Sequence, residues 1–167
     1  GVAKLVSKYD DRGNMVECSF YGVDGEPCLS AEGVAKLVSK YDDRGNVIER
    51  AFYGVDGEPC LSAEGVAKLV SKYDDRGNMI ECAYYGVDGE PCLINNGYAK
   101  WESKYDDRGN MIECSFYGVD GEPCLHSDGN AKWVSKYDDR GNVEEFSFYG
   151  VDGKPCLIKD GYAKWVS

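Results

Sequence analysis

One six-residue motif, Tyr-Asp-Asp-Arg-Gly-Asn, occurs five times in this chain, and consecutive copies begin 32 residues apart. The copies begin at Tyr9, Tyr41, Tyr73, Tyr105 and Tyr137. A fixed period of this length is typical of stacked supersecondary units, each of which buries its apolar surface against its neighbours. The period therefore predicts an array of equivalent repeats, in which a single excised repeat does not hold its shape.

The 167 residues divide into five repeats, at about 1–32, 33–64, 65–96, 97–128 and 129–160, and a partial sixth at 161–167. Gly1 and Gly161 occupy the same position of the repeat, so the chain begins and ends at equivalent points. We expect one repeat array that is a fragment of a longer protein.

Glycine and proline mark the turns. All 21 glycines fall on four positions of the repeat, and all five prolines fall on one. In each repeat, two segments contain a tight turn that ends in glycine. A glycine in the left-handed conformation at this point is typical of a β-hairpin loop. We expect about three short strands per repeat, at Ala3–Tyr9, Met15–Tyr21 and Pro27–Ser30 in the first. The predicted fold is all-β, an elongated solenoid or spiral of antiparallel β-hairpins.

A three-residue loop at Asp11-Arg12-Gly13 predicts the strand register. It places Ala3 opposite Tyr21 and Tyr9 opposite Met15 on one face, with Phe20 on the other. The predicted structural core consists of aromatic, cysteine and leucine side chains that recur with the repeat: Tyr9, Phe20, Tyr21, Cys28, Leu29, Tyr41, Phe52, Tyr53, Cys60, Tyr73, Tyr85, Cys92, Tyr105, Phe116, Tyr117 and Cys124.

Composition excludes two classes of partner. The formal net charge of −11 disfavours nucleic acid, because phosphate binding requires a basic surface. No long apolar run is present, so we expect no membrane insertion. The acidity is also consistent with a soluble repeat protein that resists self-association.

Cysteines occupy two positions of the repeat. One holds Cys28 and its four equivalents, whereas the other holds Cys18, Cys82 and Cys114 but Arg50 and Phe146 in the remaining repeats. This mismatch favours reduced, buried thiols, which in turn favour a cytoplasmic location. Three disulfides within hairpins, or a metal site, are the alternatives, but cysteines ten residues apart without histidine match no common zinc spacing.

The sequence offers little for catalysis. The only histidine, His126, lies in a variable turn, and no Ser-His-Asp or Cys-His set is available. The Asp-Asp-Arg-Gly-Asn turn lacks the ligand pattern of an EF-hand, and its arginine would repel calcium. We expect no enzyme activity, no cofactor and no bound metal.

Aromatic substitutions distinguish the later repeats from the earlier ones. The position held by Leu5, Leu37 and Leu69 holds tryptophan afterwards, and the position of Val2 gains tyrosine. These differences predict either repacking of the core or recognition specific to certain repeats. The candidate ligand-binding residues are Tyr98, Trp101, Trp133, Tyr162 and Trp165.

Two motifs resemble known repeat families. The segment KYDDRGNMIE resembles the YD repeats of RHS-type bacterial proteins, and FYGVDGEPCL is similar to the hairpins of choline-binding and cell-wall-binding repeats. The resemblance implies a bacterial β-hairpin array and, for the second family, a cell-surface location. The first two repeats lack the tryptophans of the choline-binding type.

These observations favour a non-catalytic repeat scaffold that presents an extended surface for protein–protein interaction. Two alternatives stay open. One is carbohydrate or cell-surface ligand binding through the Tyr/Trp positions. The other is a structural fibre that assembles head to tail.

Overall fold

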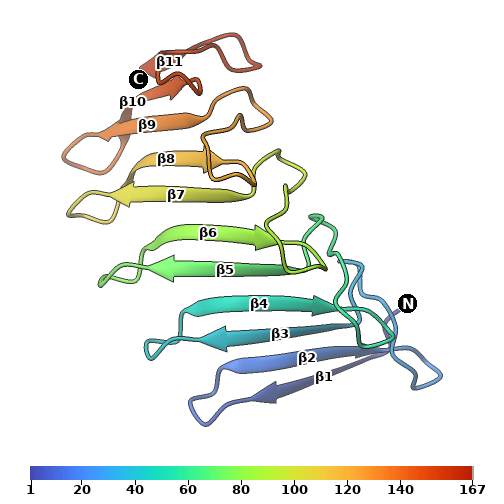
Figure 1. Ribbon diagram of the computed structural model, residues 1–167. Helices are drawn as coiled ribbons and strands as arrows, with labels where there is room; N and C mark the ends of the chain where they lie inside the picture. The colour runs from blue at the N-terminus through green and yellow to red at the C-terminus, as the bar shows by residue number, and fades with distance from the viewer. Residues whose placement is uncertain (167) are drawn as a thin grey trace. The chain divides into compact units, whose positions relative to one another are not determined.

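The computed structural model describes residues 1–166, and this part of the chain contains eleven β-strands and no helix (Figure 1). The strands are β1 Lys4–Tyr9, β2 Met15–Tyr21, β3 Lys36–Tyr41, β4 Val47–Tyr53, β5 Lys68–Tyr73, β6 Met79–Tyr85, β7 Lys100–Tyr105, β8 Met111–Tyr117, β9 Lys132–Tyr137, β10 Val143–Tyr149 and β11 Lys164–Val166. Within residues 1–166, then, no helix could cross a membrane.

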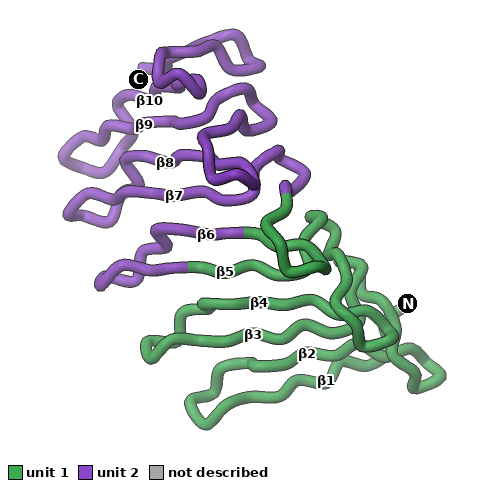
Figure 2. The backbone as a smooth tube through the Cα atoms, in the orientation of Figure 1, with its two compact units in different colours: residues 1–71, 84–92 green, residues 72–83, 93–167 purple. Residues whose placement is uncertain are grey.

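The chain forms two compact units (Figure 2). Unit 1 comprises Gly1–Ser71 and Tyr84–Cys92, and unit 2 comprises Lys72–Ala83 and Leu93–Ser167. Strands β1 to β4 lie in unit 1 and β7 to β11 in unit 2, whereas β5 and β6 each have residues in both units. From β1 to β5, and again from β6 to β11, each strand pairs antiparallel with the next. The structure thus confirms the predicted all-β array of antiparallel hairpins.

Each repeat contains two strands rather than three. The predicted strand Pro27–Ser30 is reduced to a single bridge between Tyr21 and Pro27, with one further backbone bond from Cys28 to Phe20 (3.0 Å). Proline has no N–H to donate, so a ladder that begins there is weak from its first residue. The connection then turns away through Ser30, whose N–H donates to the carbonyl of Val34 (2.8 Å).

The predicted register is wrong for most of the hairpin. Tyr9 opposes Met15 as expected, but the register then shifts by one, so Lys8 opposes Glu17 and Lys4 opposes Tyr21. This shift is a β-bulge, which sets two residues of one strand against one residue of its partner. Because side chains alternate between faces, a shift of one residue changes which side chains of the two strands share a face, so Leu5 lies on the same face as Phe20 rather than on the opposite one.

One face of the hairpins is buried. It carries the positions of Leu5, Ser7, Cys18 and Phe20, since Leu5 opposes Phe20 and Ser7 opposes Cys18. The most deeply buried side chains of this layer and its connections recur with the repeat: Cys18, Val34, Ala35, Ser39, Val66, Ala67, Ser71, Cys82, Ala99, Asn130, Ala131 and Ser135.

The residues predicted to form the core differ in their burial. Phe116 is buried, and most of the other predicted core residues are half-buried. Tyr9 and Leu29 are exposed instead, at 62% and 52%. Tyr9 lies on β1, which pairs only with β2, whereas the equivalent Tyr41 donates its hydroxyl to the carbonyl of Met15 in the preceding hairpin (2.8 Å). Leu29 belongs to the connection that forms no third strand.

Candidate functional site

Two kinds of turn lie at opposite ends of each hairpin. We call the segments 10–14, 42–46, 74–78, 106–110 and 138–142 the arginine turns, and the segments 22–26, 54–58, 86–90, 118–122 and 150–154 the valine turns. Both kinds have the same backbone bonds. In the arginine turn, the N–H of Asp106 donates to Asn110 and that of Gly109 to Asp106 (3.0 and 3.1 Å). In the valine turn, the N–H of Gly118 donates to Glu122 (2.9 Å).

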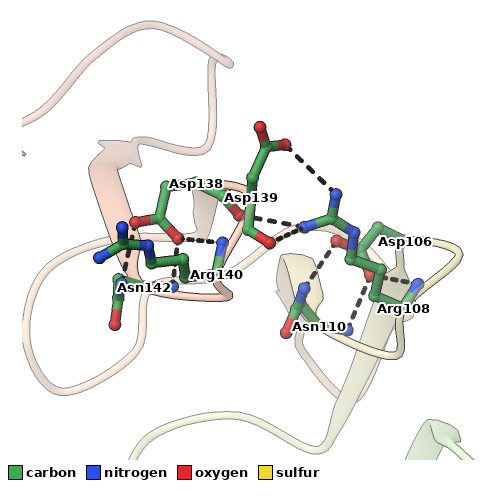
Figure 3. Close-up of polar contacts among 7 residues, drawn as sticks. All are labelled: Asp106, Arg108, Asn110, Asp138, Asp139, Arg140 and Asn142. Atoms are coloured by element: carbon green, nitrogen blue, oxygen red, sulfur yellow. Dashed lines mark hydrogen bonds and ion pairs between the residues drawn. The ribbon is translucent and has the colours of Figure 1, made fainter.

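The arginine turn is closed by its first aspartate. Asp106 accepts hydrogen bonds from the backbone of Arg108 and Asn110 and from the side-chain amide of Asn110, at 2.8–2.9 Å (Figure 3). The side-chain bond from Asn110 is the largest cause that holds the pKa of Asp106 below its ordinary value. Gly109 adopts φ 86°, a conformation that glycine tolerates best.

Successive arginine turns are also linked to each other. Arg108 donates to the carbonyl of Asp139 at 2.8 Å and pairs with its carboxylate at 3.3 Å (Figure 3). Arg12 contacts Asp43 in the same way, and Arg76 contacts Asp107. Turn closure and turn linkage therefore give a structural role to the aspartates, the arginine and the asparagine that recur in the motif. Over residues 1–166, no three His, Cys, Asp or Glu side chains are grouped closely enough to hold a metal ion.

The predicted ligand-binding aromatics do not form one open row. Tyr98 is 8% exposed and packs against Phe116, with ring centroids 4.8 Å apart. Trp133 stacks on Phe146 at 4.8 Å, and Trp101 is half-buried opposite Phe116. Only Tyr162 and Trp165 of the five are exposed, at 40% and 47%. Ligand binding by these five residues stays a prediction.

The second face of the hairpins carries lysine, glutamate and tyrosine. The Lys36 ammonium lies 4.7 Å from the ring centroid of Tyr53, and Lys100 stands in the same way over Tyr117. Lys8 pairs with Glu17 at 2.7 Å on this face. Cation–π contacts and exposed ion pairs of this kind contribute about 1 kcal/mol or less each.

A groove of about 700 Å³ opens on this polar face in unit 2. It is distinguished by Glu102, which stands where the other complete repeats have valine. Glu102 accepts hydrogen bonds from Lys100 (2.7 Å) and from the hydroxyl of Tyr117 (3.2 Å). The bond from Lys100 is the largest cause that lowers the pKa of Glu102, and burial opposes it. Sequence reasoning missed this residue, although its departure from valine was a visible signal.

The valine turns expose apolar side chains in every repeat. Val55, Val87, Val119 and Val151 are 53–55% exposed, and Val23 is 94% exposed. The leucine that follows each turn is also exposed, at 49–67%, in Leu29, Leu61, Leu93, Leu125 and Leu157. Sequence reasoning missed this feature because it assigned the leucine to the core. The available signal was valine between two turn glycines, a position that has no partner strand.

The cysteines are free thiols, and the structure gives them no sign of reactivity. Burial raises the pKa of Cys114 to about 11 and also raises the pKa of Cys124. A thiol of raised pKa is a poor nucleophile at neutral pH. Cys124 lies 3.6 Å from the carbonyl of Gly97, at the start of the same repeat, and donates to it.

His126 is held within the fold. Its ring centroid lies 4.9 Å from that of Phe116 and 5.7 Å from that of Tyr98. Its Nδ1 atom accepts a hydrogen bond from the backbone of Asp128 at 3.1 Å. The only histidine therefore packs against two aromatic rings and caps a turn.

Comparisons with known proteins show no family. No family model and no curated protein matches the chain. Solved structures do match. The crystal structure of TcdB2-TccC3 without its hypervariable C-terminal region is 13% identical over 86% of this chain, with a TM-score of 0.45. TcdB2-TccC3-TEV is 16% identical over 96% of this chain, with a TM-score of 0.44. This chain spans 9% of the length of each. The resemblance to YD repeats stays a prediction.

Proposed function

We propose that this chain is a non-catalytic repeat scaffold that presents an extended surface to a protein partner. The observation that carries the proposal is the exposed apolar side chain at each valine turn, which recurs in every repeat of both units. Contiguous apolar surface on a soluble protein commonly marks an interaction site. Equivalent side chains on successive repeats extend such a site along the array.

The groups considered for catalysis support the non-catalytic part of the proposal. His126 is packed between aromatic rings, and the pKa values of Cys114 and Cys124 are raised. Activated nucleophiles instead have lowered pKa values or an adjacent general base. A panel of hydrolase and transferase substrates with the purified chain is expected to show no turnover above background.

The glycan-binding alternative rests on the two exposed rings, Tyr162 and Trp165. Because Tyr98 is buried and Trp133 is covered on one side by Phe146, a row of stacking platforms has less support than a protein surface. Titration of tryptophan fluorescence with glycans and choline tests this alternative. Quenching that is lost in Trp165→Ala would favour it over our proposal.

Head-to-tail assembly is a further alternative, and light scattering against protein concentration tests it. We expect the mass of a single chain at every concentration, since the net charge of −11 opposes association. A mass that grows with concentration would instead favour a fibre.

Affinity capture with the immobilised chain, followed by cross-linking, tests the scaffold itself. The matched variant lacks residues 65–96, which removes one repeat and leaves the period intact. If the partner contacts several repeats, its affinity falls at least severalfold in this variant. Failure to capture any partner, or a partner that binds both chains equally, would contradict an extended binding surface.

A further inference from the structure

A small hollow lies beside the last valine turn of unit 2, between consecutive repeats. Its volume is about 160 Å³, and Pro123 borders it from one repeat while Gly150, Val151 and Gly153 border it from the next. Phe116 and Ala131 contribute to its walls. A cavity of about 150 Å³ with apolar walls accepts a benzene-sized group. The hollow is therefore large enough for one apolar side chain of a partner.

The charges on the two valine turns of unit 2 differ. Lys132 lines the hollow, and in the turn that borders it Lys154 pairs with Asp152 at 3.5 Å. The turn 118–122 is acidic: the carboxylate of Asp120 accepts a hydrogen bond from the backbone of Glu122 (3.0 Å), and the turn contains no basic residue. In unit 1 the equivalent turns carry Asp24, Glu26 and their counterparts, and none of these three turns contains a basic residue. A partner that places cations beside its apolar side chains would complement this surface.

The spacing of the turns selects the shape of the partner. Consecutive valine turns are two strands apart in the sheet, which corresponds to about 9.5 Å. Seven residues of an α-helix advance by about 10.5 Å and return to the same face. Three residues of an extended strand advance by about 10 Å, but their side chains alternate between faces. A helix matches successive turns on one face, and a strand does not.

Resting on the proposed scaffold function, we propose that the two valine turns of unit 2, 118–122 and 150–154, bind an amphipathic basic helix of a partner protein. One apolar side chain per heptad contacts each valine turn, and in unit 2 one of them enters the hollow beside Val151. Lysine or arginine next to these side chains pairs with Asp120 and Glu122. A lipid surface is disfavoured, because anionic head groups would meet the same carboxylates.

The probe is a dye-labelled helical peptide of about three heptads with leucine and lysine on one stripe. Fluorescence anisotropy measures its binding to the full chain. We expect binding that weakens at high salt, and no binding of a peptide with the same residues in scrambled order. The variant Val119→Lys/Val151→Lys places two cations on the exposed turn positions and is expected to weaken binding at least tenfold.

The matched control is Glu144→Lys, which changes the net charge by the same amount at an exposed position of β10. It is expected to change affinity less than twofold. Far-UV circular dichroism checks that both variants are folded, and Val119→Ser/Val151→Ser provides a second test without added charge. If Val119→Lys/Val151→Lys and Glu144→Lys lose the same amount of peptide affinity, net charge alone drives binding. That result would overturn the proposal.

Three other outcomes would also overturn it: no binding of the helical peptide, stronger binding of an extended peptide with alternating leucine and lysine, or stronger binding of vesicles of anionic phospholipid. The scaffold function is judged separately by affinity capture. If a protein partner is captured equally by the wild-type chain and by Val119→Lys/Val151→Lys, the scaffold stands and the helix site is wrong. If the peptide binds as described but no protein partner is captured, the scaffold function is the part that fails.

Discussion

The arginine turns and the valine turns have the same backbone conformation but differ in the contacts that their side chains make. Both kinds place a glycine of positive φ at the same point, as Gly109 and Gly121 show at 86° and 79°. In the arginine turns the side chains are used within the molecule, by Asp106 in its own turn and by Arg108 on the next. In the valine turns the apolar side chain points to solvent. The valine turn is closed by its glycine and by one bond to its aspartate, which leaves the valine side chain available for binding.

The largest expected difference in stability is between a substitution on the buried face and a substitution in the valine turn that follows it. Phe116→Ala removes a ring that is 7% exposed and packs on Tyr98, so it should lower the free energy of unfolding by about 3–5 kcal/mol. Val119→Ala removes a side chain that is 53% exposed and should change it by less than about 0.5 kcal/mol. Urea denaturation measures both. A loss above 2 kcal/mol in Val119→Ala, on the order of a core substitution, would mean that the valine supports the fold.

A second pair of variants compares the two turns directly. Asp106→Ala deletes an acceptor of three hydrogen bonds, whereas Asp120→Ala deletes an acceptor of one. We expect Asp106→Ala to lower the urea midpoint more, because more turn N–H groups lose their partner. Equal midpoints would show that the side-chain network of the arginine turn adds nothing beyond the backbone bonds.

The arginine turns should also make stability depend on pH. The pKa values of Asp10, Asp42, Asp74, Asp106 and Asp138 are lowered, chiefly by the side-chain bond from the asparagine four residues later. The ordinary value is about 3.9, so the unfolded chain takes up protons first as the pH falls. Their stabilisation is complete above about pH 5 and is lost as the pH falls below about 4.

A double variant isolates this pH effect. Asn78→Ala/Asn110→Ala removes the main cause of the lowered pKa at two turns, so its stability should fall less between pH 5 and pH 3 than that of the wild-type chain. Urea denaturation at each pH provides the measurement. Parallel curves for the two chains would mean that acid destabilisation arises elsewhere, for example at Glu102 or Glu145, whose pKa values are also lowered.

The smallest effect is expected for the bond between successive arginine turns. Arg108 and Asp139 are 54% and 102% exposed in their side chains, so Arg108→Ala should cost no more than about 0.5 kcal/mol, and less at high salt. Arg140→Ala is the matched control, because within residues 1–166 its side chain has no such contact (Figure 3). If Arg108→Ala lowers the free energy of unfolding by more than this, the arginine turns stabilise one another cooperatively.

Part of the functional surface was accessible from the sequence. The sequence showed which positions vary among repeats, and it located the aromatic substitutions at Tyr98, Trp101 and Trp133. It did not show that Tyr98 would be buried against Phe116, because exposure depends on which face of the hairpin meets the core. Nor did it show that Leu29 would be exposed, because that outcome depends on a third strand that does not form.

The sequence by itself determined the period, the all-β class and the positions of both turns. Glycine and proline encode these features locally, since each restricts the backbone at its own residue. Only the tertiary structure decided the strand register, and with it the face that is buried. A register shift between Lys8 and Tyr9 moves the pairing by one residue and changes which side chains of the two strands share a face, because side chains alternate along a strand. The pairing of whole strands therefore determined which of the repeated side chains form the core and which are left for a partner.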